Sequence, residues 1–142
     1  MIEVYTDGSI RKNPGGPGGW GFVVVRDGVA SEQVAGGSPS TTNNIMEMTA
    51  VIEAILFLKD ELRFTIVSDS QYVVKGVNEY MWSWCAKGWP ERVKNRELWQ
   101  FMHSIFEREF MSIEWVRGHA GNAHNEIADY LAGQEMRRYY SE

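Results

Sequence analysis

Residues 20–35 read WGFVVVRDGVASEQVA, and this stretch decides the fold. Two runs of strand-forming residues, 20–26 and 29–35, are joined by Asp27 and Gly28, a strong short-range signal for a β-hairpin. Residues 2–7 alternate as another short strand, and the glycine-rich residues 13–19 between them form the densest turn cluster in the chain. We therefore predict that the chain begins with three strands.

Helices and two more strands follow the hairpin. The capping residues 40–44 precede a helical pattern that ends at Lys59, and 64–68 is typical of a buried strand. Further helices are predicted at 71–76, 79–87, 95–108 and 124–138, with a fifth strand at 111–116. This order predicts an α/β fold with a five-stranded mixed sheet, antiparallel in its first three strands and then parallel, flanked by helices.

The composition indicates a soluble globular protein with a single domain over residues 1–142. The chain is 44% apolar and 23% charged, and its single cysteine, Cys85, excludes an internal disulfide. The first residues carry neither a basic region nor a long apolar run, so we expect no secretory signal, and the most apolar segment, 48–58, is too short to span a bilayer. We expect a cytoplasmic monomer without an obligate protein partner. The net charge of −5 argues against nucleic acid as a partner unless the basic residues are clustered.

Four acidic residues suggest the chemistry: Asp7, Glu47, Asp69 and Asp129. Asp7 and Asp69 end the first and fourth predicted strands, where ligands of open α/β sheets bind. Glu47 shares the core-facing side of its predicted helix with Val51. Asp129 lies about one turn into the last helix, on the inward face that it shares with Asn125. Gathered carboxylates repel one another unless cations lie between them, and hard oxygen ligands suit two Mg²⁺ ions, with Mn²⁺ as a substitute.

Each acid also has a simpler interpretation. Asp7 precedes glycine and is compatible with a turn, and Asp69 is compatible with an N-cap. Glu47 is compatible with a capping box formed with Asn44, and Asp129 with a solvated helix position. The convergence of all four at one rim of the predicted sheet favours the metal site.

Five segments in order resemble the bacterial type 1 ribonuclease H family over essentially the whole chain. They are YTDGS around Asp7, NPGGPGGWG, TTNNIMEM around Glu47, SDSQYV around Asp69, and VRGHAGNAHNEIADYLA, which contains His119 and Asp129. The resemblance implies the ribonuclease H fold and magnesium-dependent hydrolysis of the RNA strand of RNA–DNA hybrids. It implies two metal ions held by the four acids, products with 3′-hydroxyl and 5′-phosphate ends, and a role for His119 in proton movement or product release. Zinc at His119 and His124 lacks further ligands nearby.

The resemblance also implies contacts with the hybrid. Those to the minor groove come from Asn13, Asn43, Asn44 and Gln71, since amides both donate to and accept from 2′-hydroxyl groups. Thr42 and Asn95 match positions that hold a DNA phosphate, whereas Tyr80 and Trp84 match aromatic residues near a deoxyribose. Residues 80–99, called here the 80–99 segment, carry four basic residues against two acidic ones and correspond to a basic protrusion, although we expect most of its tryptophans to be core.

Three departures from the family pattern predict weaker hybrid binding than in a strongly basic relative. Cys85 to Lys87 lack a basic run and the following loop is short, Ser40 replaces an arginine, and Ile10 replaces a small polar or sulfur-containing residue. Two other classes stay open: a hybrid-binding module that does not cleave, and an interaction domain built on the same fold. Cleavage of a labelled hybrid distinguishes both from the enzyme.

Overall fold

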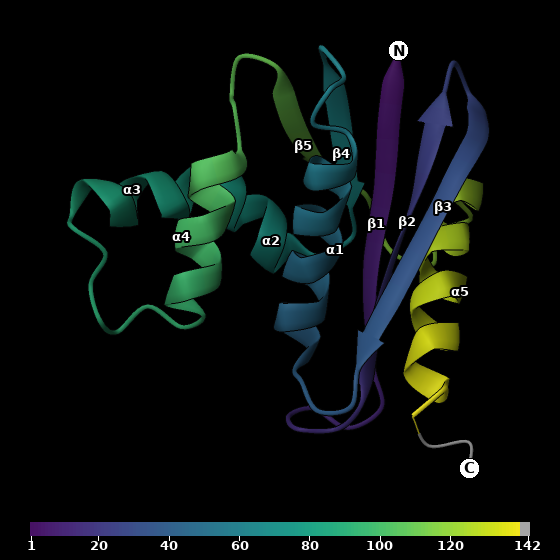
Figure 1. The fold of residues 1–142 in the computed structure, drawn as a ribbon, viewed down its shortest axis with the longest axis horizontal. Helices are drawn as coiled ribbons and strands as arrows, with labels where there is room; N and C mark the ends of the chain where they lie inside the picture. The colour runs from purple at the N-terminus through teal and green to yellow at the C-terminus, as the bar shows by residue number, and fades with distance from the viewer. Residues whose placement is uncertain (140–142) are drawn as a thin grey trace.

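The structure is a computed structural model and describes residues 1–139. These residues form a sheet with helices on both faces (Figure 1). Its five strands are β1 (Ile2–Ile10), β2 (Gly18–Arg26), β3 (Val29–Ser38), β4 (Phe64–Ser68) and β5 (Met111–Trp115). They lie in the order β3-β2-β1-β4-β5. The first three are antiparallel, and β4 and β5 run parallel to β1. The predicted mixed sheet is confirmed.

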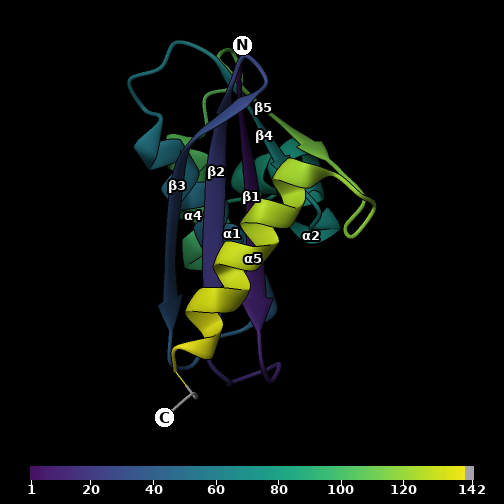
Figure 2. The same cartoon turned by 90° about the vertical axis from the view of Figure 1, so that its right-hand side faces the viewer.

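The helices are divided unequally between the two faces of the sheet. They are α1 (Asn43–Phe57), α2 (Gln71–Lys75), the π-helical turn η1 (Gly76–Tyr80), α3 (Met81–Ala86), α4 (Arg96–Ile105) and α5 (Ala123–Arg137). All except α5 lie on one side, whereas α5 crosses β1 and β2 on the other (Figures 1 and 2). No helix within residues 1–139 is long and apolar enough to cross a membrane.

The first strand is longer than the sequence predicts. It continues through Asp7 to Ile10, because Gly18 and Gly19 belong to β2 and pair with Ile10 and Ser9. Neither position has room for a side chain, because α5 packs directly on the backbone of Gly19, and Thr41 and Met46 lie against Gly18. A Cβ on Gly19 would lie 2.2 Å from the carbonyl oxygen of Ala132. The prediction that Asp7 ends the first strand is therefore wrong, and the acid lies inside β1.

Residues 71–86 form one continuous helical path in place of the two separate helices predicted from the sequence. The π-helical turn η1 joins α2 to α3, as π-turns often interrupt α-helices. Gly76, at the start of this turn, lies against the fully buried Trp99 of α4, and a Cβ there would be 2.0 Å from the indole ring. The path therefore approaches α4 closely where it carries no side chain.

The larger hydrophobic core lies beneath α1. It includes the fully buried Val4 and Phe22 of the sheet, Met48 of α1, and Trp99. A smaller cluster lies beneath α5 and consists of Tyr5, Val23, Val25, Val67 and Ala128. Burial of apolar surface is the main favourable contribution to folding. The cluster beneath α1 therefore contributes more to the stability of the fold than the cluster beneath α5.

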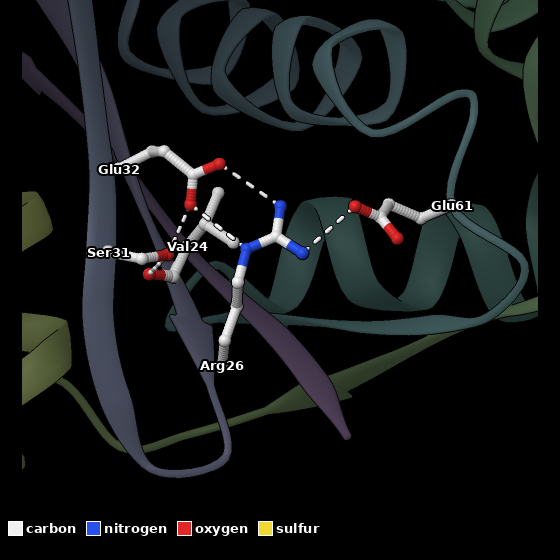
Figure 3. Close-up of polar contacts among 5 residues, drawn as sticks. All are labelled: Val24, Arg26, Ser31, Glu32 and Glu61. Carbon is white, nitrogen blue, oxygen red and sulfur yellow. Dashed lines mark hydrogen bonds and ion pairs between the residues drawn. The ribbon is translucent and has the colours of Figure 1, made fainter.

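A charged network ties the strands together at the end of the sheet where β1 begins (Figure 3). Arg26 of β2 forms ion pairs with Glu32 of β3 at 3.0 Å and with Glu61, in the loop before β4, at 2.9 Å. Ser31 donates to the carbonyl oxygen of Val24 and also contacts Glu32. All three charged side chains are more than a third exposed, so solvent screening keeps their contribution to stability small.

Candidate active site

Asp7 and Asp69 are brought level by the parallel pairing of β1 with β4. The last paired residues of the two strands are Thr6 and Ser68, so each acid comes directly after them. The Asp7 carboxylate accepts a hydrogen bond from the Gly8 backbone N–H at 2.8 Å, which fixes its orientation. Strand register therefore places two carboxylates from positions far apart in the sequence side by side.

Glu47 reaches the same place from α1. Gly8 makes this possible, because an added Cβ would lie only 2.6 Å from the backbone nitrogen of Glu47. The first turns of α1 therefore pack directly on β1, just beyond Asp7. Glu47 is buried, as its register on the core-facing side of the helix predicts. Thr42 caps the helix by accepting from Ile45 N–H at 3.2 Å, so the capping-box interpretation of Glu47 is wrong.

Asp129 comes from α5 on the opposite face. Gly21, which pairs with Asp7, lets this helix approach, since an added Cβ would lie 2.7 Å from Leu131 and 3.3 Å from the carbonyl oxygen of Ala128. Asp129 is half-buried, and Asn125, one turn earlier on the same face, is almost fully buried. The helix therefore presents Asp129 towards the sheet, as its shared face with Asn125 predicts.

Oxygen atoms of Asp7, Glu47 and Asp69 all lie within 4.8 Å of one another. Among residues 1–139, these are the side chains arranged to hold a metal ion, and the group contains no histidine or cysteine. Asp129 lies outside it but is close enough for its charge to raise the pKa of Asp7 and Asp69. The zinc alternative has no support in this part of the chain.

The pKa of Asp7 is raised from its ordinary value of 3.8 to about 8, chiefly because the side chain is buried and further because Asp69 repels its charge. Burial also raises the pKa of Glu47 well above its ordinary value, and repulsion from Asp7 and Asp69 adds to this effect. Burial raises the pKa of Asp69, while hydrogen bonding with Asp7 partly opposes the rise. Ionising all three carboxylates together is therefore unfavourable without a compensating positive charge.

The three acids fit a divalent cation. Oxygen Oε1 of Glu47 is buried and has no hydrogen-bond partner among residues 1–139, although buried polar atoms are normally paired. A cation among the carboxylates would satisfy this atom and offset the repulsion. Oxygen-only ligands favour Mg²⁺ or Mn²⁺ over softer metals.

The structure does not support the simpler interpretations of Asp7 as a turn residue and of Asp69 as a helix N-cap. Ser70 is the N-cap of α2, because its side chain accepts from Val73 N–H at 3.2 Å, so Asp69 is not the cap. Asp7 lies in a strand and not in a turn. Both carboxylates are therefore left to face the other acids.

His119 lies in the exposed loop between β5 and α5, near enough for its charge to influence the pKa of Asp69. Its backbone φ of 56° is in the left-handed region, which is uncommon for residues other than glycine and often marks functional sites. The preceding Gly118 touches Asp69, and an added Cβ would lie 2.8 Å from Oδ2 of that carboxylate. This loop is therefore part of the surroundings of the acids.

Two residues near Asp69 were missed as site residues in the sequence. Gly118 is one of them, because an added Cβ at this position would displace the Asp69 carboxylate. Trp115 ends β5 and donates its indole N–H to the backbone oxygen of Asp69 at 3.1 Å. A large aromatic residue at the carboxyl end of a strand next to the acid-bearing strand is the signal that indicates it.

The predicted minor-groove residues lie in the loop after β1, in the first turn of α1 and at the start of α2. Asn13 accepts a hydrogen bond from the backbone N–H of Asn43 at 3.3 Å, which ties the glycine-rich loop to the start of α1. Asn43 and Asn44 form the first turn of the helix that carries Glu47, and Gln71 is exposed two residues after Asp69.

The predicted phosphate and deoxyribose contacts lie further along the chain. Thr42 uses its hydroxyl for the helix cap, and Asn95 donates to the hydroxyl of Tyr72 at 3.2 Å. The rings of Tyr80 and Trp84 lie 5.9 Å apart, with Tyr80 46% exposed. Tyr80 is therefore an exposed aromatic residue that packs beside Trp84.

The 80–99 segment is held by aromatic packing and not by regular structure alone. Trp99 is fully buried, whereas Trp82, Trp84 and Trp89 are half-buried against the core. Its exposed cations are Lys87, Arg92 and Lys94. The prediction that most tryptophans of this segment serve packing agrees with these positions.

A mixed sheet that gathers carboxylates from two neighbouring strands and a helix, with a further acid on the opposite helix, defines a class of acidic, metal-binding α/β proteins. Comparison with known sequences makes the assignment specific, because the family described as RNase H matches residues 1–137. The chain belongs to the RNase H family.

Individual relatives agree over nearly the whole chain. The chain is 48% identical to "Ribonuclease H" of Bordetella pertussis strain Tohama I over 140 residues, which cover 96% of this chain and 89% of the relative. The crystal structure of "LC9-RNase H1, a type 1 RNase H with the type 2 active-site motif" superposes with a TM-score of 0.84 at 33% identity, covering 97% of this chain and 72% of that one. The fold is also that of "LC11-RNase H1 in complex with RNA/DNA hybrid", with a TM-score of 0.75 at 22% identity over 97% of this chain and 98% of that one.

Proposed function

We propose that the protein is an endoribonuclease that hydrolyses the RNA strand of RNA–DNA hybrids, leaving 3′-hydroxyl and 5′-phosphate ends. The observation that carries the proposal is the cluster of Asp7, Glu47 and Asp69, whose oxygens lie within 4.8 Å of one another. Membership of the RNase H family and the hybrid bound to a protein of the same fold support the substrate.

The RNase H family depends on divalent metal ions, and the cluster offers the ligands. Asp7, Glu47, Asp69 and Asp129 would hold two Mg²⁺ ions, or Mn²⁺ in their place, around the scissile phosphate. When bound, these ions would activate water for attack on phosphorus and neutralise the charge that develops on the departing oxygen.

The protein residues would orient the reacting groups. The strand register that holds Asp7 beside Asp69 fixes the spacing of the acids before substrate arrives, so little reorganisation is needed during the reaction. Water adds to phosphorus, the bond between phosphorus and the 3′-oxygen breaks, and that oxygen leaves with a proton as a 3′-hydroxyl. His119, which is exposed near Asp69, would move this proton or assist product release.

Recognition of the RNA strand would come from amides beside the cluster. Asn13, Asn43, Asn44 and Gln71 can each donate to and accept from a 2′-hydroxyl, the group that distinguishes RNA from DNA. Thr42 and Asn95 would hold a phosphate of the DNA strand, and Tyr80 with Trp84 would lie against its deoxyribose. The monomeric state, single domain and cytoplasmic location remain predictions from the sequence.

Cleavage of an RNA–DNA hybrid labelled on the RNA strand tests the proposal. We expect cleavage in millimolar Mg²⁺ or Mn²⁺, none in EDTA, and none of an RNA duplex or a DNA duplex of the same sequence. The Asp69→Asn variant is the matched control for metal binding. Binding of the hybrid without cleavage by the unaltered protein would instead identify a recognition module, and absence of both would favour an interaction domain.

A further inference from the structure

A small hollow lies beside the candidate active site, between α2 and the end of β5. Its volume is about 210 Å³, and Gln71, Val74, Lys75 and Trp115 line it. The hollow is smaller than the roughly 300–1,000 Å³ of pockets that enclose a whole small ligand. It therefore suits one unit of a longer molecule that is held elsewhere.

Trp115 forms one wall in a fixed orientation. Its indole N–H donates to the backbone oxygen of Asp69 at 3.1 Å. In the sheet, Trp115 of β5 is paired with Ser68, the last residue of β4. The side chain is nevertheless 46% exposed. An aromatic ring that is held by one hydrogen bond and open on its surface can receive a flat or apolar group at little entropic cost.

The opposite wall carries a cation and an amide. Lys75 and Gln71 are both exposed on α2, and they line the hollow together with Trp115. An aromatic surface next to a lysine is the combination by which proteins hold the sugar, base and phosphate of nucleic-acid strands. Because Trp115 is hydrogen-bonded to the backbone of Asp69, a nucleic-acid strand that enters the hollow passes close to the carboxylate cluster.

We propose that this hollow is a subsite for one ribose–phosphate unit of the RNA strand, close to the phosphate that is cleaved. Trp115 packs against the ribose and Lys75 neutralises the phosphate, while Gln71 contacts the 2′-hydroxyl. The subsite rests on the proposed hydrolysis of RNA–DNA hybrids and adds two residues, Trp115 and Lys75, to the substrate-binding surface.

Four variants distinguish direct contact with the substrate from an indirect effect on the position of Asp69. Trp115→Ala removes both the ring and the bond to Asp69, whereas Trp115→Phe keeps a flat ring and removes the N–H. Lys75→Gln removes a charge from the hollow. Its matched control is Lys59→Gln, because Lys59 follows the end of α1, whereas Glu47 lies near the start of that helix. The measurements are kcat and KM for a labelled hybrid in Mg²⁺, and hybrid binding by fluorescence anisotropy in EDTA.

We expect Trp115→Ala to raise KM and weaken hybrid binding about tenfold, the loss of one aromatic contact to a nucleotide. Trp115→Phe should largely preserve both while lowering kcat. Lys75→Gln should reduce the slope of log KM against log salt by about 0.7 to 0.9, one phosphate contact, and Lys59→Gln should leave it unchanged. A Trp115→Ala variant that loses kcat but keeps KM and binding would show that Trp115 only positions Asp69, and would overturn the proposal.

The strand is identified by neutral phosphates. Hybrids carrying a single methylphosphonate at successive positions are compared between the unaltered protein and Lys75→Gln. One position in the RNA strand should abolish the difference between the two proteins, and a position in the DNA strand alone would contradict the assignment. If the unaltered protein binds the hybrid but does not cleave it, hydrolysis is refuted while the binding measurements still decide on the subsite.

Discussion

Replacing Asp7 by asparagine should stabilise the protein in the absence of metal. The side chain is ionised in the unfolded chain at pH 7, but its pKa is raised from 3.8 to about 8 in the folded protein. Each pKa unit corresponds to about 1.4 kcal/mol, so confining Asp7 in the cluster costs on the order of 4 kcal/mol at pH 7. Asparagine carries no charge and keeps an oxygen that can accept from the Gly8 N–H. We expect the Asp7→Asn variant to be more stable by about 2 to 4 kcal/mol under these conditions.

The pH dependence has a defined sign. Because the folded-state pKa is raised, folding binds a proton, and the contribution of Asp7 to stability is fully present below pH 3.8 and is lost as the pH rises towards 8. The unaltered protein in EDTA should therefore lose stability over this range. The advantage of Asp7→Asn should grow by on the order of 1 kcal/mol per pH unit between pH 5 and pH 8.

Urea denaturation followed by circular dichroism, at several pH values in EDTA, measures these differences. Asp27→Asn is a control of opposite sign, because hydrogen bonding to the N-terminal ammonium lowers the pKa of Asp27, and its contribution is lost as the pH falls. Millimolar Mg²⁺ should stabilise the unaltered protein more than Asp7→Asn, since a ligand stabilises the state that binds it. Parallel pH profiles for Asp7→Asn and the unaltered protein, or indifference of the latter to Mg²⁺, would refute a crowded and repulsive site.

Four other changes test separate parts of the structure. Gly118→Ala should raise the Mg²⁺ concentration needed for half-maximal cleavage about tenfold with little change in stability, because the added Cβ displaces the Asp69 carboxylate; an unchanged requirement would contradict the contact. His119→Ala should lower kcat about 100-fold and leave hybrid binding nearly intact, and unchanged turnover would remove His119 from the mechanism. Gly76→Ala should destabilise the protein by about 3 kcal/mol or more, measured by urea denaturation, because the new methyl group meets the buried Trp99 ring; a loss below 1 kcal/mol would show that the helices separate easily. Replacing the exposed Lys87 and Lys94 together by glutamine should reduce the slope of log KM against log salt by about 1.5, and no change would exclude the 80–99 segment from phosphate contact.

The elements with strong local signals were predictable from the sequence. Asp27 and Gly28 form the turn between β2 and β3, and both have the positive φ values that the hairpin signature requires. The order of strands and helices then determined the mixed sheet. The acids could be identified because each lies where an element begins or ends, or on a predicted inward face.

The errors arose where tertiary contacts override local preference. Gly18 and Gly19 have the composition of a turn but are strand residues, because α5 leaves no space for a side chain at Gly19, and Thr41 and Met46 leave none at Gly18. The local pattern consequently ends the first strand at Asp7, whereas β1 continues to Ile10. The π-helical turn at Gly76 depends on Trp99, more than twenty residues later, so no local pattern predicts it. The indole bond from Trp115 to Asp69 likewise exists only once β4 and β5 are paired.

The bare backbone of β2 has a consequence for how such a protein can diverge. Because Gly19 and Gly21 set the separation between α5 and the sheet, the height of Asp129 above Asp7 depends on main-chain contact and not on the size of core side chains. Substitutions beneath α1 can alter melting temperature and still leave this height unchanged. We therefore expect lineages of this protein to adapt to hot or cold habitats by exchanging residues on the α1 face, while these two glycines resist replacement.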